Sequence, residues 1–154
     1  MIVRTCAVIV FAVFTLTAQA SPGDVAGLVV KKSPYSATET IDRLARTLKK
    51  KGITIAARWS HHQGARDAGI ELRPTELIIF GNPEVGSHFF TSAQTAGIDL
   101  PMKALAWEDA DGQVWLGYND PRYIADRHGI DDRGDTVRKM ARALDKLTGA
   151  AITP

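Results

Sequence analysis

KALAWEDADGQVWLGY, residues 103–118, decides the fold of this chain. Its two halves, 103–108 and 113–118, contain the branched and aromatic residues that favour β-strands. The connection between them, Asp109-Ala110-Asp111-Gly112, has the aspartates and the glycine that tight reversals require. The stretch therefore predicts a β-hairpin, and a hairpin makes its two strands antiparallel neighbours.

Three further strands are predicted upstream of this hairpin, at Leu28–Lys32, Ile53–Trp59 and Glu76–Phe80. A helix is predicted only between the first two strands, so the last four strands follow one another directly. Consecutive strands favour an antiparallel sheet in an α+β fold over a doubly wound parallel sheet.

Two long helices are predicted to cover one face of this sheet. The first begins at Ser36, where Glu39 completes a capping box, and it ends at the lysine run before Gly52. The last covers Asp132–Leu147, with apolar residues at helical spacing. A short helix is expected around Pro121–His128. We therefore expect about five strands in the order strand-helix-four strands-helix, with Trp107 or Trp115 substantially buried.

Residues 1–20 have the pattern of a secretory signal peptide. Arg4 precedes an apolar run from Ala7 to Phe14, and Ala18-Gln19-Ala20 ends the segment with small residues. The run is shorter than the roughly 20 residues of a spanning helix, so we expect no stable membrane anchor. We expect cleavage after Ala20, a single mature domain over residues 21–154, and a periplasmic or secreted protein.

The mature chain is nearly neutral and contains no cysteine. Removal of residues 1–20 takes away Arg4 and Cys6, which are one of the 19 basic residues and the single cysteine. A balanced charge gives no reason to expect nucleic acid as a partner. Because nucleophile-elbow, phosphate-loop and dinucleotide motifs are also absent from the sequence, we predict no cofactor.

Four polar residues near predicted strand ends are the candidate ligand-binding residues: His61, Arg73, Asn82 and Glu108. Arginine binds carboxylates or phosphates in bidentate fashion, and a carboxylate beside Trp107 can act as a general acid. We expect His61, Arg73 and Glu108 to approach one another around a solvent-accessible cleft. The alternative for Arg73 and Glu108 is a structural ion pair. For Asn82, fixing a turn is favoured over contact with a ligand.

The four histidines give a weak metal signal. His61, His62, His88 and His128 show neither His-x-His nor His-x-x-x-His spacing, so we predict no metal site. The alternative is a metal or haem handling protein that uses His61, His62 or His88, with Met102 as a soft ligand.

Several ordered motifs resemble a bacterial and archaeal family known as domain of unknown function 302. The resemblance covers roughly 25–147, and it is carried by Ala65-Arg66-Asp67-Ala68-Gly69, Leu72-Arg73-Pro74-Thr75, Phe80-Gly81-Asn82-Pro83, Ile98-Asp99-Leu100-Pro101, Trp107-Glu108-Asp109 and Tyr118-Asn119-Asp120-Pro121. It implies a TATA-binding-protein-like α+β fold that pairs as a homodimer, and it implies no reaction. The sequence departs from the family pattern at His88-Phe89-Phe90, where small and aliphatic residues are usual.

These observations lead to one expectation about function and two alternatives. We expect an exported domain that binds a small, anionic or amphipathic molecule or that serves as an accessory to another protein. The first alternative is a cofactor-independent enzyme with His61 and Glu108 as acid and base. The second is the metal or haem handling protein. The sequence leaves open whether the protein is catalytic.

Overall fold

The computed structural model describes residues 25–154, so the predicted signal peptide and its cleavage after Ala20 lie outside the described residues. Five strands form one sheet in the order β1-β5-β4-β3-β2, and each neighbouring pair is antiparallel. The strands are β1 (Leu28–Ser33), β2 (Thr54–Ser60), β3 (Thr75–Gly81), β4 (Met102–Glu108) and β5 (Val114–Asn119). The predicted α+β class and antiparallel sheet are confirmed.

The hairpin of β4 and β5 forms as the turn residues predict. Asp109 Oδ1 accepts hydrogen bonds from the backbone N–H groups of Asp111 (3.0 Å) and Gln113 (2.9 Å). Gly112 has a φ of 77°, a value that side chains rarely tolerate. Trp107 therefore lies opposite Trp115 in the ladder.

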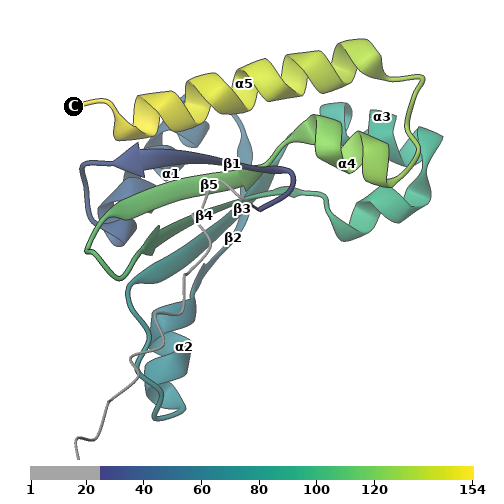
Figure 1. Cartoon of the computed structure of the whole chain (residues 1–154). Coiled ribbons are helices and arrows are strands. Elements are labelled where there is room, and N and C mark those ends of the chain that lie inside the picture. Colours follow the sequence, from purple (N-terminus) through teal and green to yellow (C-terminus); the bar gives the residue numbers. More distant parts are fainter. Residues whose placement is uncertain (1–24) are drawn as a thin grey trace, which may run out of the picture.

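The two long helices, α1 (Ala37–Lys50) and α5 (Gly134–Ile152), lie over the same face of the sheet (Figure 1). Ser36 caps α1 by accepting a hydrogen bond from the Glu39 N–H at 3.2 Å. The last helix starts two residues later than predicted and continues to Ile152. The core between helices and sheet is built from the buried side chains of Ile41, Leu44, Leu48, Ile78, Phe80, Ala104, Ala106, Leu116, Leu144 and Leu147.

Polar contacts attach the helices to particular strands. Lys31 of β1 forms an ion pair of 2.7 Å with Asp145 of α5. At the end of β1, the buried hydroxyls of Ser33 and Thr40 are 2.6 Å apart, which joins the strand to α1. Because buried hydroxyls are costly unless they are paired, this contact fixes the position of α1 along the sheet.

Three short helices are additions to the predicted order: α2 (His61–Asp67), α3 (Pro83–Ser92) and the 3₁₀ helix η2 (Gln94–Ile98). No residue of α2 is buried, and Phe89 is the buried residue of α3. Helices that bury so little have no apolar periodicity, which is why pattern analysis did not find them. The predicted short helix is present as α4 (Pro121–Arg127).

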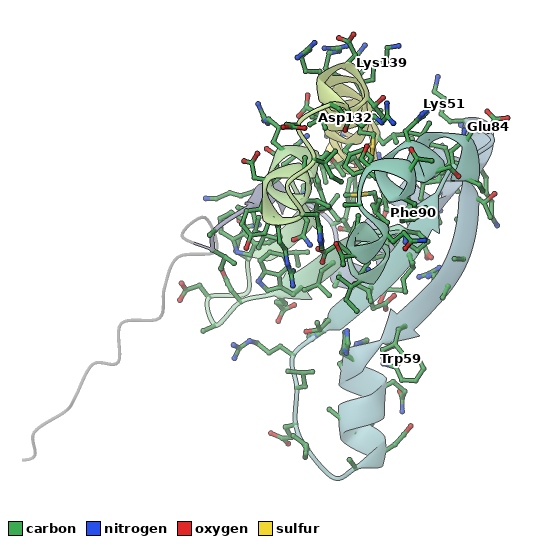
Figure 2. All side chains as sticks on the ribbon, turned by 90° about the vertical axis from the view of Figure 1, so that its right-hand side faces the viewer. Lys51, Trp59, Glu84, Phe90, Asp132 and Lys139 are labelled. Atoms are coloured by element: carbon green, nitrogen blue, oxygen red, sulfur yellow. The ribbon has the colours of Figure 1, made fainter. Side chains whose placement is uncertain are left out.

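The face of the sheet opposite α1 and α5 is also apolar, and we call it the open face. Its larger apolar side chains are half-buried or exposed: Trp59, Leu77, Ile79, Leu105, Trp107 and Trp115. Figure 2 shows Trp59 projecting from β2 just before α2, with 62% of its surface exposed. Trp107 and Trp115, for which substantial burial is expected from the sequence, are both partly buried, although they belong to the face without a helical cover and not to the core beneath α1 and α5.

Replacing Gly117 by alanine should destabilise the protein. An added Cβ would lie 3.0 Å from Trp107 Cζ3 and 3.3 Å from Val30 Cγ1, so the Trp107 ring must move. We expect a loss of about 1–3 kcal/mol, measured by urea unfolding. Gly64→Ala in α2 is the matched control, because no atom lies within 4 Å of its added Cβ. An equal stability of the Gly117→Ala variant and the wild type would contradict the described packing.

Candidate functional site: a cavity beside helix α3

The structure divides the four predicted site residues between the two ends of the sheet. Arg73 and Glu108 lie near the first residue of β3 and at the last residue of β4, and His61 follows β2 at the same end. Asn82 follows the last residue of β3 and is therefore at the opposite end. Because strands rise about 3.3 Å per residue, β3 puts roughly 20 Å between these ends. The four residues do not form one site.

At the first end, Arg73 contacts the backbone of Glu108. Arg73 Nε donates a hydrogen bond to the Glu108 carbonyl oxygen at 3.2 Å, and the Glu108 N–H donates to the Pro74 carbonyl at 3.0 Å. In the described part of the chain, Arg73 and Glu108 form no ion pair through their side chains. The contact closes the loop before β3 onto the end of β4.

His62, and not His61, makes the histidine contacts at this end. His61 is the first residue of α2 and is exposed. The Thr75 N–H donates to His62 Nδ1 at 3.2 Å, and the same nitrogen is 3.0 Å from the Ser60 hydroxyl. These contacts hold the start of α2 against β3, which is a structural role. The sequence favoured His61 over His62 as the site residue, because it placed both at the end of a strand and not at the start of helix α2.

The histidines do not converge on a metal site. His61 and His62 are in α2, whereas His88 is in α3, and these two helices lie at opposite ends of the sheet (Figure 1). His128 is 2.7 Å from Asp99 Oδ2 and 3.0 Å from the Thr95 hydroxyl. Within residues 25–154, no group of three or more histidine, cysteine, aspartate or glutamate side chains is arranged to hold a metal ion.

The carboxylate of Asp109, at the same end of the sheet as Glu108, is stabilised by several hydrogen bonds. Trp115 Nε1 donates a hydrogen bond of 2.7 Å to Asp109 Oδ2. This bond, the backbone N–H groups of Gln113 and Asp111, and the charge of Arg73 hold the pKa of Asp109 below its usual value. The carboxylate therefore fixes both the hairpin turn and the position of the Trp115 ring.

A cavity of about 530 Å³ lies at the other end of the sheet, beside Asn82. Its walls come from α3, from α5 and from the ends of β2, β3 and β4, and the lining residues are Ile53, Thr54, Ala56, Phe80, Gly81, Asn82, Pro83, Val85, Gly86, Phe90, Leu100, Pro101, Met102, Met140, Ala143, Leu144 and Leu147. Phe80, Met102 and Leu144 are buried and form its interior. Thr54, Asn82 and Ala143 are exposed and mark its mouth.

The wall formed by α3 depends on Asn82. Asn82 Oδ1 accepts a hydrogen bond from the Glu84 N–H at 2.9 Å, and Pro83 occupies the first helical position. Asparagine at the cap followed by proline is a strong helix start. Asn82 thus fixes a turn as predicted and also lines the cavity. The ring of Phe90, another residue of α3, lies close to Gly86: a Cβ atom added at Gly86 would be 3.8 Å from it.

Sequence analysis missed this cavity because its lining is scattered over four separate stretches of the chain, within 53–56, 80–90, 100–102 and 140–147. Apolar residues at a sheet end resemble ordinary core residues in sequence. Two signals were available: the Asn82-Pro83 helix start, and the aromatic residues of His88-Phe89-Phe90. Phe89 is fully buried, and Phe90 lines the cavity.

Asp109→Asn should make the free energy of unfolding less dependent on pH in the acidic range. The native carboxylate has a lowered pKa, so its contribution to stability is present above the unfolded-state pKa of about 3.9 and is lost as pH falls through the native pKa. In urea unfolding, the wild type should be more stable than the variant at neutral pH, and the gap should narrow below about pH 4. Asp111→Asn is the control, because the Gln113 N–H and the Trp115 ring donate their hydrogen bonds to the carboxylate of Asp109 and not to that of Asp111. A gap that stays constant with pH would contradict this account.

Among residues 25–154, no helix combines the length and the apolar character needed to cross a membrane.

The chain resembles both longer proteins and a solved domain. Proteins named fluoride-specific ion channel FluC 1 from Brucella suis biovar 1 (strain 1330) and FluC 2 from Brucella melitensis biotype 1 are each 47% identical over 113 residues. The match covers 73% of this chain and 44% or 42% of those proteins, so the chain spans less than half of their length.

A crystal structure of an uncharacterized conserved protein DUF302 from Bacillus stearothermophilus has the same fold. It superposes with a TM-score of 0.65 at 19% sequence identity, over 82% of this chain and 96% of that chain. The family described as "Domain of unknown function DUF302" matches residues 29–147, which include every strand of the sheet except the first residue of β1. The chain therefore belongs to the DUF302 family.

Proposed function

We propose that this protein is an exported binding domain that takes up a small molecule in the cavity beside α3. The cavity of about 530 Å³ carries the proposal. Small-molecule sites usually have volumes of about 300–1,000 Å³, mostly apolar walls and a few polar groups. A side chain that lines an empty space lacks contact partners there, and an apolar ligand would supply them.

The end of the sheet that carries His61, Arg73 and Glu108 gives less support to the alternative that the protein is an enzyme. Neither a hydrogen bond nor an ion pair joins His61 to Glu108 in the structure described for residues 25–154, and neither residue lines the cavity. An acid and a base that act on one substrate must both reach it. The metal or haem alternative has the same weakness, because Met102 is buried in the cavity wall, whereas the histidines lie elsewhere.

The accessory part of the proposal rests on the longer relatives. Proteins named as fluoride channels contain a segment that is 47% identical to this chain and makes up 44% or less of their length. A domain that is joined to a channel in some proteins supports a role beside a transport protein for this chain. In such a role, the cavity would bind the ligand to which the domain responds.

Blocking the mouth of the cavity should weaken ligand binding while leaving the fold intact. Ala143 is exposed at the mouth of the cavity, so Ala143→Trp places an indole ring across it. The probe is N-phenyl-1-naphthylamine, an uncharged dye that fluoresces in apolar surroundings. We expect the wild type to bind the dye and the variant to bind it at least tenfold more weakly.

The matched control for this experiment is Ala150→Trp, on the same helix and also exposed, but outside the cavity lining. It should bind the dye like the wild type. Circular dichroism should give the same spectrum for all three proteins. Equal dye binding by the Ala143→Trp variant and the control would refute the cavity as the binding site.

We also propose that two copies pair through the open face. Three tryptophans and three aliphatic residues make this face unusually apolar for a surface: Trp59, Trp107, Trp115, Leu77, Ile79 and Leu105. Large contiguous apolar patches on a protein surface generally mark interfaces. A two-fold axis through the face would bring the same residues of both copies together, as a homodimer requires.

A charge on the open face should therefore separate the copies. Leu105 lies at the centre of this face, between Leu77 of β3 and Gly117 of β5. Light scattering coupled to size exclusion should give twice the chain mass for the wild type and one chain mass for Leu105→Glu. Ala150→Glu, on the exposed side of α5, should stay paired. A single-chain mass for the wild type would end the proposal.

A further inference from the structure

The lining of the cavity beside α3 contains no charged side chain and only two polar ones, Thr54 and Asn82. Both are exposed at the mouth, so the interior offers neither a counter-charge nor a hydrogen bond from a side chain. A charged group that is moved from water into such surroundings has a large desolvation cost. The interior therefore accepts an uncharged chain or ring system and rejects an ion.

Charged side chains lie near the mouth of the cavity but are not part of its lining. Lys51 lies two residues before Ile53, and Glu84 lies between two lining residues of α3. Figure 2 shows Lys51 and Glu84 at the same end of the molecule. Because no charged side chain lines the cavity, its mouth has no built site for a carboxylate or an ammonium group.

Asn82 gives the mouth a specific polar group. Its Oδ1 already accepts the hydrogen bond from the Glu84 N–H at 2.9 Å, which orients the side-chain amide. The other end of that amide, Nδ2, can only donate hydrogen bonds. Within the described residues, the structure assigns no acceptor to Nδ2. The Thr54 hydroxyl is the second side-chain group of the lining that can donate, and Thr54 pairs with Gly81, the residue before Asn82.

We propose that the ligand is an uncharged, mainly apolar molecule with a carbonyl-type oxygen near one end, which accepts a hydrogen bond from Asn82 Nδ2. This inference rests on the proposed function, because it specifies the ligand of the same cavity. Esters, ketones, quinones and amides with an apolar body share this chemistry. The apolar part fills the space between Phe90, Met102 and Met140, and the oxygen stays at the mouth.

The charge requirement is tested by displacing N-phenyl-1-naphthylamine from purified protein with three matched ten-carbon compounds. These are methyl decanoate, decanoate and decyltrimethylammonium, which share the chain and differ in charge. We expect methyl decanoate to displace the dye at a concentration at least tenfold lower than either ion requires. Equal displacement by decanoate would overturn the inference, because the headgroup charge would then not matter.

The hydrogen bond is tested by Asn82→Asp. Aspartate is as good a helix cap as asparagine, so α3 should remain, but the donor is replaced by a charged acceptor. We expect the affinity for methyl decanoate to fall at least fivefold and the dye affinity to change less than twofold. Asn119→Asp, at the end of β5 and outside the lining, is the control for the added charge. Unchanged ester affinity in the Asn82→Asp variant would remove Asn82 from the site.

The outcomes separate this inference from the proposed function. If the wild type does not bind the dye, or the Ala143→Trp variant binds it equally well, the cavity is not the binding site and both proposals fail. If the Ala143→Trp variant loses the dye but decanoate competes as well as its ester, the cavity binds small molecules of another class. In that case the proposed function stands and this inference fails.

Discussion

The alternation of side chains along five antiparallel strands is the constraint on which the rest of the structure depends. The register places Ile78, Ala104 and Leu116 on the face beneath α1 and α5, and it places Leu77 and Trp107 on the open face. A shift of one residue in any pair would exchange these two sets. The same register brings the end of β3 and the start of β4 together, where α3 and the middle of α5 line the cavity.

The two ends of this sheet have different characters. At one end, polar groups are used to close loops: Arg73 donates to the Glu108 carbonyl, His62 receives the Thr75 N–H, and Asp109 fixes the hairpin. Partners within the protein satisfy these groups, so little remains for a ligand. At the other end, the walls are apolar and Asn82 retains a donor at the mouth. Recognition of a small molecule therefore fits the second end better.

The sequence predicted the elements that have strong local signals. The Asp109–Gly112 turn, the cap at Ser36 and the apolar spacing of α1 were sufficient for the hairpin, the first helix and the antiparallel sheet. Helices α2 and α3 were missed because they bury almost no side chains. Arg73 and Glu108 lie at one end of the sheet, as their positions at strand ends predict. Asn82 was expected to fix a turn, and the helix that begins after it at Pro83 was not recognised. The cavity depends on how α3 returns across the sheet end, which no local pattern reveals.

One nuclear magnetic resonance experiment tests the binding account most directly, because methionine and tryptophan residues report on different surfaces. Met102 and Met140 line the cavity, and Trp59, Trp107 and Trp115, the three tryptophans of the chain, all lie on the open face. With methyl decanoate added to protein labelled at methionine methyl and tryptophan indole groups, we expect the Met102 and Met140 methyl signals to shift and to show Overhauser contacts with the alkyl chain. The indole signals should not change. Shifts of the indoles with unchanged methionine signals would contradict the account, because they would place the ligand on the open face.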